Sequence, residues 1–253
     1  MSKKRGLILL IIGILLCSLF VPCLVVVLTE YNQTNRLIQA IKSENVSEVK
    51  EVLAEGTNPN RTDIMPSAFW SLFETTPQRP LTVACTVGNL EIVRLLIDHG
   101  ATAEYREETG FSPLRATLLY YQPDDPKIVE LLLSNGASID HEEGEFPAFY
   151  AARMVPREYD VHKANGTVFV GGYDEESAVG ITEIVATLSS VHGIDSTDST
   201  GKTLLMIGVK SENTYLVQHL IEKGCDLSIV DNAGRTAWDY AQITGNQEII
   251  GLF

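Results

Sequence analysis

The longest apolar stretch of the chain is Gly6–Leu28, which holds 23 residues and no charged side chain. At about 1.5 Å per residue, a helix of this length crosses a hydrocarbon core of roughly 30 Å. Lys3, Lys4 and Arg5 precede the stretch, so the positive-inside rule places residues 1–5 in the cytoplasm. The pattern predicts a transmembrane signal anchor at 6–28, with the rest of the chain outside the cytoplasm.

Two alternatives concern the fate of this segment. A cleaved signal peptide has an apolar core of about 7–15 residues and a small-x-small cleavage site, which Val26-Val27-Leu28 does not provide. Lipidation at Cys17 or Cys23 would need small residues before the cysteine, and neither has them. A retained anchor followed by a short linker at 29–34 is therefore favoured, and a cleaved or lipidated periplasmic protein is the alternative.

The remaining sequence is organised by an internal repeat. Residues 84–93 (ACTVGNLEIV) and 241–250 (AQITGNQEII) are identical at five of ten positions. Related blocks lie at 40–49 and 208–217. Pro80 and Pro113 suit the first turn of a helix, where the missing N–H costs nothing, and Gly-Asn suits a tight turn. Glycines 100, 136 and 224 suit left-handed helix ends. The pattern predicts pairs of helices stacked on one another.

These blocks resemble the ankyrin repeat. The matching segments are Gly110-Phe-Ser-Pro-Leu114, Gly88-Asn-Leu-Glu-Ile-Val93 and Leu95-Leu-Ile-Asp-His-Gly-Ala101. The resemblance covers roughly residues 35–253 and implies an all-α solenoid of about six helix-turn-helix repeats. The spacing predicts two insertions, near 61–78 and 157–180.

The charge distribution narrows the class of partner. The formal net charge is −14, and it is −17 beyond residue 28, where 33 acids face 16 bases. A body this acidic is a poor ligand for nucleic acid, because nonspecific binding there depends on cationic contacts to phosphate. Such a charge attracts a partner with a basic surface instead.

The sequence contains no recognisable catalytic, cofactor-binding or metal-binding motif. The five histidines are scattered, and Asp195–Asp198 is too sparse for a calcium loop. Cys85 and Cys225 are expected to be buried free thiols, because three repeats separate them. We therefore expect no small-molecule substrate, cofactor or metal.

Candidate partner-binding residues lie in the insertions and at loop tips. The first insertion concentrates aromatic side chains that either contact a partner or fold back onto the neighbouring repeat. The second is a hairpin or long loop that either binds or is merely tolerated. Loop tips at 102–108, 138–144 and 228–232 add the fingertips that the resemblance implies. The candidates are Phe69, Trp70, Phe73, Tyr105, Arg106, Glu142, Glu143, His162, Phe169 and Tyr173.

Resemblance to ankyrin proteins implies a non-enzymatic module that binds another protein. With the predicted anchor, this points to the bacterial inner membrane and a periplasmic ankyrin domain. Such a protein suits the role of an immunity protein that neutralises a secreted toxin or effector enzyme such as a lipase. The alternatives are a stress-protection scaffold for a periplasmic enzyme such as catalase, and an enzyme with a site in the 157–180 insertion.

Overall fold

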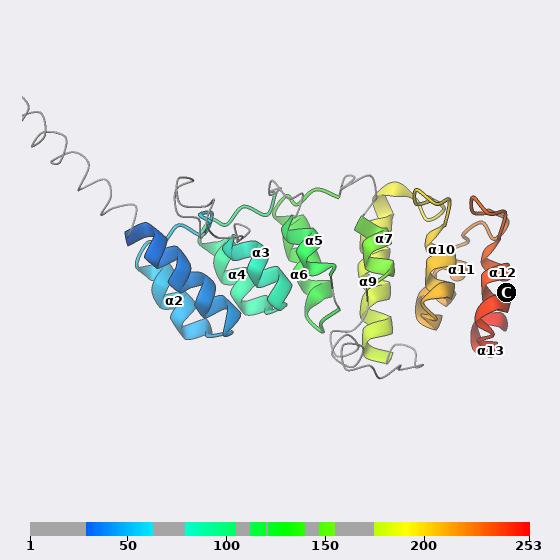
Figure 1. The fold of residues 1–253 in the computed structure, drawn as a ribbon, viewed down its shortest axis with the longest axis horizontal. Helices are drawn as coiled ribbons and strands as arrows, with labels where there is room; N and C mark the ends of the chain where they lie inside the picture. Colours follow the sequence, from blue (N-terminus) through cyan, green and yellow to red (C-terminus); the bar gives the residue numbers. More distant parts are fainter. Residues whose placement is uncertain (1–28, 63–78, 105–111, 120, 140–146, 155–174) are drawn as a thin grey trace, which may run out of the picture. The chain divides into compact units, whose positions relative to one another are not determined.

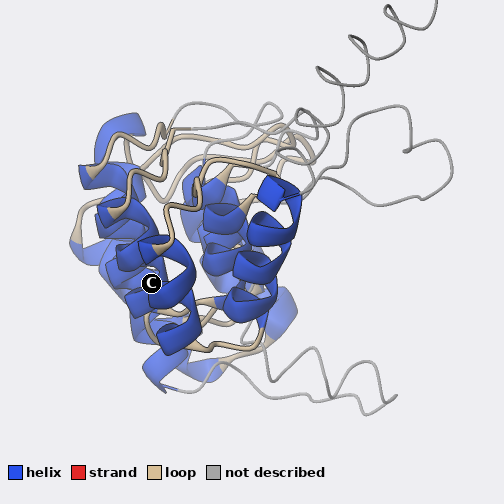
Figure 2. Cartoon of the chain, turned by 90° about the vertical axis from the view of Figure 1, so that its left-hand side faces the viewer, coloured by secondary structure: helices blue, strands red, loops and turns tan. Residues whose placement is uncertain are grey.

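The computed structural model describes residues 29–62, 79–104, 112–119, 121–139, 147–154 and 175–253 (Figure 1). The chain divides into two units, Met1–Pro80 and Leu81–Phe253. Each unit is described by itself below. In the described parts of both units the backbone forms helices and loops, with an isolated bridge between Thr197 and Thr203 (Figure 2).

Within residues 29–62, the first unit contains one helix pair. Residues 29–42 are helical, and α2 (Val46–Ala54) follows after a turn in which Glu44 has a φ of 54°. Asn45 ends the turn, because its side chain accepts a hydrogen bond from the amide of Glu48 at the start of α2. The guanidinium of Arg36 on the first helix joins the two helices. It donates hydrogen bonds to Glu48 and Glu51 in α2 and to Glu55 at its end. The side chains buried in this pair are Leu37, Ile38, Ile41, Val49, Val52 and Leu53.

Residues 29–34, which the sequence predicts to be a short linker, form the first part of the helix that ends at residue 42. The hydroxyl of Thr34 donates to the carbonyl of Glu30, four residues earlier, at 3.0 Å. No glycine or proline occurs between Thr29 and Lys42, so nothing in this stretch interrupts the helical hydrogen bonds.

In its described residues the second unit contains five helix pairs, which with the described pair of the first unit agrees with the expectation of about six repeats. The pairs are α3 (Pro80–Val87) with α4 (Leu90–Asp98), α5 (Pro113–Thr117) with α6 (Asp125–Ser134), α7 (Pro147–Ala152) with α9 (Glu175–His192), α10 (Leu204–Lys210) with α11 (Thr214–Glu222), and α12 (Ala237–Thr244) with α13 (Gln247–Ile250). Pro80 is assigned to the first unit although α3 runs into the second.

Local sequence signals set the ends of these helices. Pro113 follows the N-cap Ser112, as expected for the first helical turn. Gly88 adopts a φ of 79°, and the neighbouring Asn89 caps α4 by accepting from the amide of Ile92. Glycines 100, 136 and 224, which follow α4, α6 and α11, have φ values of 88°, 89° and 78°. The sequence predictions of a Gly-Asn turn and left-handed stops are confirmed.

The helices of the second unit form two layers. The second helices of successive pairs pack on one another, in the order α4, α6, α9, α11 and α13. The first helices α7, α10 and α12 do the same. Because α6, α9 and α11 each have a neighbour before and after them, residues such as Ile128, Ile184 and Leu216 become fully buried. The all-helical architecture predicted from the repeats is confirmed for the described residues.

Helix α9 differs from the expected repeat. It begins at Glu175, so the last six residues of the insertion expected at 157–180 are helical. Gly180 lies inside the helix rather than in a turn before it. Apolar side chains are buried at every third or fourth position along α9. This spacing puts them on one face of the helix, which explains its length. Those side chains are Ala178, Ile181, Ile184, Val185 and Leu188.

The predicted cytoplasmic segment 1–5 and anchor 6–28 lie outside the described residues. Within the described ranges, no helix combines the length and the apolar composition needed to cross a membrane.

Candidate protein-binding surface

Two loops in the C-terminal half of the chain have the same internal construction. The first finger loop (residues 193–203) connects α9 to α10, and the second finger loop (residues 224–236) connects α11 to α12. In the first, a carboxylate oxygen of Asp198 accepts hydrogen bonds from the amides of Thr200 and Lys202 at 2.8 and 2.9 Å. The amide of Asp198 also donates to the carbonyl of Lys202 at 2.9 Å, which closes the loop.

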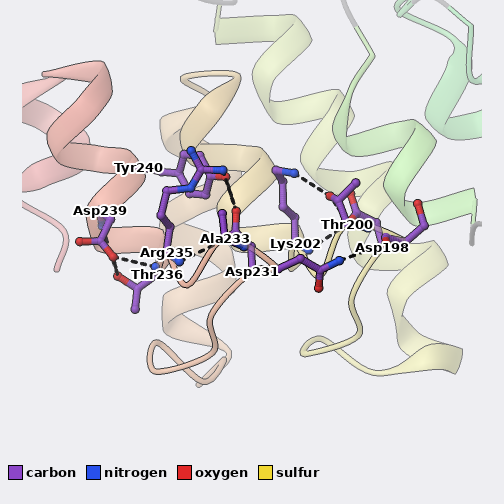
Figure 3. Close-up of polar contacts among 11 residues, drawn as sticks. Asp198, Thr200, Lys202, Asp231, Ala233, Arg235, Thr236, Asp239 and Tyr240 are labelled. Atoms are coloured by element: carbon purple, nitrogen blue, oxygen red, sulfur yellow. Dashed lines mark hydrogen bonds and ion pairs between the residues drawn. The ribbon is translucent and has the colours of Figure 1, made fainter.

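Asp231 has the same role in the second finger loop (Figure 3). Its carboxylate accepts from the amides of Ala233 and Arg235 at 2.9 and 3.0 Å. The amide of Asp231 donates to the carbonyl of Arg235 at 2.9 Å, and Gly234 completes the turn with a φ of 75°. In both loops one buried aspartate therefore fixes the backbone of the following turn.

Each aspartate has a cationic partner. Arg153 donates to Asp198 at 2.5 Å, and Arg235 donates to Asp231 at 3.0 Å. Burial by itself would raise the pKa of Asp198, but hydrogen bonds from Thr200 and Lys202 and the charge of Arg153 lower it overall. The carboxylates of Asp198 and Asp231 therefore stay ionised. In this form each of them can accept several hydrogen bonds.

Hydrogen bonds also connect one finger loop to the next. The amide of Asn232 donates to the carbonyl of Thr200 at 3.1 Å, and its side chain donates to the carbonyl of Ser199 at 3.4 Å. Near the base of the loops, the amide of Asp226 donates to the carboxylate of Asp195 at 2.8 Å. The two loops therefore form a continuous surface held by backbone contacts, which lowers the entropic cost of binding a partner.

This surface exposes apolar side chains at fixed positions. Leu227 is 39% exposed and Val230 is 52% exposed, both in the second finger loop. Ser228 and Asn232 beside them are exposed and polar, and Asp195 and Asp226 add negative charge. Apolar side chains surrounded by polar groups on a rigid loop are typical of a protein-binding site. Chemically, the arrangement can bind a surface but offers no converging acid and base for catalysis.

The ten candidate residues proposed from the sequence all lie outside the described residues, so their role stays a prediction. They are Phe69, Trp70, Phe73, Tyr105, Arg106, Glu142, Glu143, His162, Phe169 and Tyr173. The loop tips expected at 102–108 and 138–144 are described only in part. The tip expected at 228–232 is described completely and belongs to the second finger loop.

Sequence reasoning overlooked the two anchoring aspartates and the exposed pair Leu227 and Val230. A signal for the aspartates exists, since Asp198-Ser-Thr-Gly-Lys-Thr203 and Asp231-Asn-Ala-Gly-Arg-Thr236 share one pattern. The structure shows that Asp198 holds its own loop by accepting hydrogen bonds from the amides of Thr200 and Lys202. In the described part of the chain, no three metal-binding side chains cluster together.

The two cysteines within the described ranges are buried and free, as the sequence predicted. Burial raises the pKa of the Cys85 thiol to about 12 and that of Cys225 to about 11. Neither thiol is therefore set up to act as a nucleophile.

Comparison with known proteins agrees with this architecture. A family described as "Ankyrin repeats (3 copies)" matches residues 37–143 and 177–253. The putative ankyrin repeat protein FPV230 of fowlpox virus is 24% identical over 212 residues, which cover 81% of this chain and 91% of that protein. The ankyrin repeat and KH domain-containing protein mask-1 of Caenorhabditis elegans is 37% identical over 65 residues. That match covers 26% of this chain but only 2% of mask-1.

A solved structure has a similar fold. It is a chain in the complex of the predatory endopeptidase Bd0816 from Bdellovibrio bacteriovorus with the immunity protein Bd3460. The TM-score is 0.57 at 21% identity, over 86% of this chain and 95% of that chain. The family match extends over most of the sequence and includes the observed helix pairs except α7 and the N-terminal ends of the first helix and α9. The protein therefore belongs to the ankyrin-repeat family.

Proposed function

We propose that this protein is a membrane-anchored ankyrin protein of the bacterial periplasm that binds a secreted toxic enzyme and neutralises it. The observation that carries the proposal is the surface formed by the two finger loops, which is rigid and exposes Leu227 and Val230. Ankyrin proteins bind other proteins through such loops. The fold it shares with a chain of an endopeptidase–immunity protein complex supports an immunity role.

The charge of the chain supports a basic partner. Beyond residue 28 the net charge is −17, and the finger loops contribute Asp195 and Asp226. A field of this sign accelerates the approach of a positively charged protein and weakens as salt is added. An immunity protein has to capture its enzyme quickly, so electrostatic steering suits this role.

The apolar run Gly6–Leu28 supports an anchored, extracytoplasmic domain. On this proposal, external protease added to intact bacterial spheroplasts degrades the repeat domain, while a tag fused before Met1 is protected. Protection of both ends would place the domain in the cytoplasm and overturn this part of the proposal.

The central experiment is capture from bacterial envelope extract with the full chain in detergent, followed by an activity assay of the captured protein. The test variant is Leu227→Ser/Val230→Ser. The control is Ile243→Ser, because Ile243 is 67% exposed but lies on α12, outside the finger loops. We expect the partner's affinity to fall at least about tenfold in the test variant and to be retained in the control.

The activity assay decides between the roles. An immunity protein abolishes the activity of a captured hydrolase at about one equivalent. A captured enzyme such as catalase that stays fully active would overturn the immunity role and favour a scaffold. Equal binding by all three proteins would exclude the finger loops as the binding surface.

A further inference from the structure

A pocket of about 510 Å³ lies between the start of α6 and the first half of α9. Tyr121, Pro126 and Lys127 line one side of it, and Glu176, Gly180 and Glu183 line the other. The finger loops follow the C-terminal ends of the second helices, whereas this pocket lies towards their N-terminal ends. It is therefore separate from the surface described above.

Gly180 shapes the pocket. A Cβ atom at this position would lie 2.1 Å from the hydroxyl of Tyr121, so only glycine lets that side chain approach the helix. Tyr121 is buried, and its hydroxyl donates to the carbonyl of Glu176 at 3.4 Å. The side chain of Tyr121 therefore fills the space that a side chain at position 180 would take, and it forms part of the pocket wall beside α9.

The rim of the pocket carries negative charge. Glu176 and Glu183 lie seven residues apart on α9, so their side chains are on the same face, on either side of Gly180. Both residues are exposed, and no salt bridge within the described residues reaches either carboxylate. Lys127 is the basic residue of the lining, and it is paired with Asp124 at 3.2 Å.

We propose that this pocket receives an arginine side chain of the protein partner. A guanidinium is planar and donates to two carboxylates at once, which fits a pocket that has two glutamates at its rim and Tyr121 in its wall. Pro126 offers an apolar wall for the methylene stem of the same side chain. The proposal rests on the proposed protein-binding function and gives the partner a second contact, away from the finger loops.

The test uses the full chain in zwitterionic detergent micelles and does not need the partner. N-acetyl-arginine amide is titrated into the ¹⁵N-labelled protein, and the amide resonance of Gly180 is followed. We expect a saturable shift. Glu176→Gln/Glu183→Gln should weaken binding at least about fivefold, because it removes both charged acceptors. Glu222→Gln/Glu248→Gln removes the same charge from α11 and α13 and should leave the affinity within about twofold.

N-acetyl-citrulline amide, a neutral analogue of similar shape, is the ligand control and should not shift Gly180. Equal binding of citrulline, equal losses in both double variants, or no shift at Gly180 would each overturn the arginine pocket. The partner captured through Leu227 and Val230 would still bind in that case, so the failure of this inference is distinguishable from failure of the proposed function.

Discussion

The hydroxyl of Tyr240 donates to the carboxylate of Asp231 at 2.5 Å, which joins the second finger loop to α12. The guanidinium of Arg235 lies 4.7 Å from the centre of the Tyr240 ring and also donates to Asp231. The hydrogen bond from Tyr240, then those from the backbone, hold the pKa of Asp231 well below its usual range. The same aspartate, after burial, raises the pKa of Tyr240. One carboxylate thus couples the loop to the helix behind it.

The first prediction is a loss of stability in acid that depends on Asp231. Its pKa is lower in the folded state than the unfolded value of about 3.9, so its ionised form stabilises the fold above about pH 4. This contribution falls progressively as the pH drops below that value. In urea unfolding, Asp231→Asn should be less stable than wild type at pH 7, and the difference should shrink by pH 2.5. A difference that is constant with pH would contradict this role.

The second prediction concerns Asn213, a buried cap that contacts a neighbouring repeat. Its side-chain oxygen accepts from the amide of Leu216 at 3.0 Å, and its amide group donates to the carbonyl of Ala178 in α9 at 3.3 Å. Asn213→Ala removes both bonds and leaves a buried N–H, so we expect a loss of about 2–3 kcal/mol in unfolding free energy.

The control for Asn213 is Asn246→Ala. Asn246 caps α13 through the amides of Glu248 and Ile249, but its amide group donates only to the exposed Glu212. Its replacement should cost about 1 kcal/mol. Equal losses in the two variants, measured by urea unfolding under the same conditions, would show that the bond to α9 contributes nothing.

The sequence predicted those features that depend on near neighbours in the chain. Pro113 begins a helix and Gly88-Asn89 makes a turn because fixed φ angles and capping are local properties. Gly180 depends instead on a distant part of the chain. Glycine is needed at position 180 because the side chain of Tyr121, which precedes α6, occupies the space where a Cβ atom would lie. Sequence periodicity carries no information about such a contact.

Part of the candidate surface was predictable in location, but the first finger loop and Leu227 lie outside every predicted loop tip. The tip at 228–232 was expected from the repeat pattern, and Val230 lies within it. The roles of Asp198 and Asp231 depend on hydrogen bonds to the turn that follows each of them, and acidic residues in loops are usually solvated. Only the recurrence of the same pattern in both finger loops distinguishes them from ordinary surface charges.

The third prediction compares two glycines inside helices. A methyl group at Gly180 would overlap the ring of Tyr121, so Gly180→Ala should displace that side chain and cost about 1–3 kcal/mol in unfolding free energy. At Gly208 in α10, an added Cβ would lie 3.3 Å from the side chain of Leu216, which would have to shift by only a few tenths of an ångström. Alanine there also gains about 1 kcal/mol in helix propensity. Gly208→Ala should therefore stay within about 1 kcal/mol of wild type, and equal effects in urea unfolding would contradict the Tyr121 contact.

The fourth prediction ranks the two buried thiols. Burial raises the pKa of Cys85 to about 12, and a hydrogen bond with Thr117 offsets only part of this effect. Burial and, after it, the charge of Asp195 raise the pKa of Cys225 to about 11. Because the thiolate is the reactive form, iodoacetamide at pH 8 should modify Cys85 at least about tenfold more slowly than Cys225. Both should react rapidly in urea, which serves as the control. Peptide mapping by mass spectrometry follows each cysteine separately, and equal rates in the folded protein would show that the repeat around Cys85 opens far more often than its burial implies.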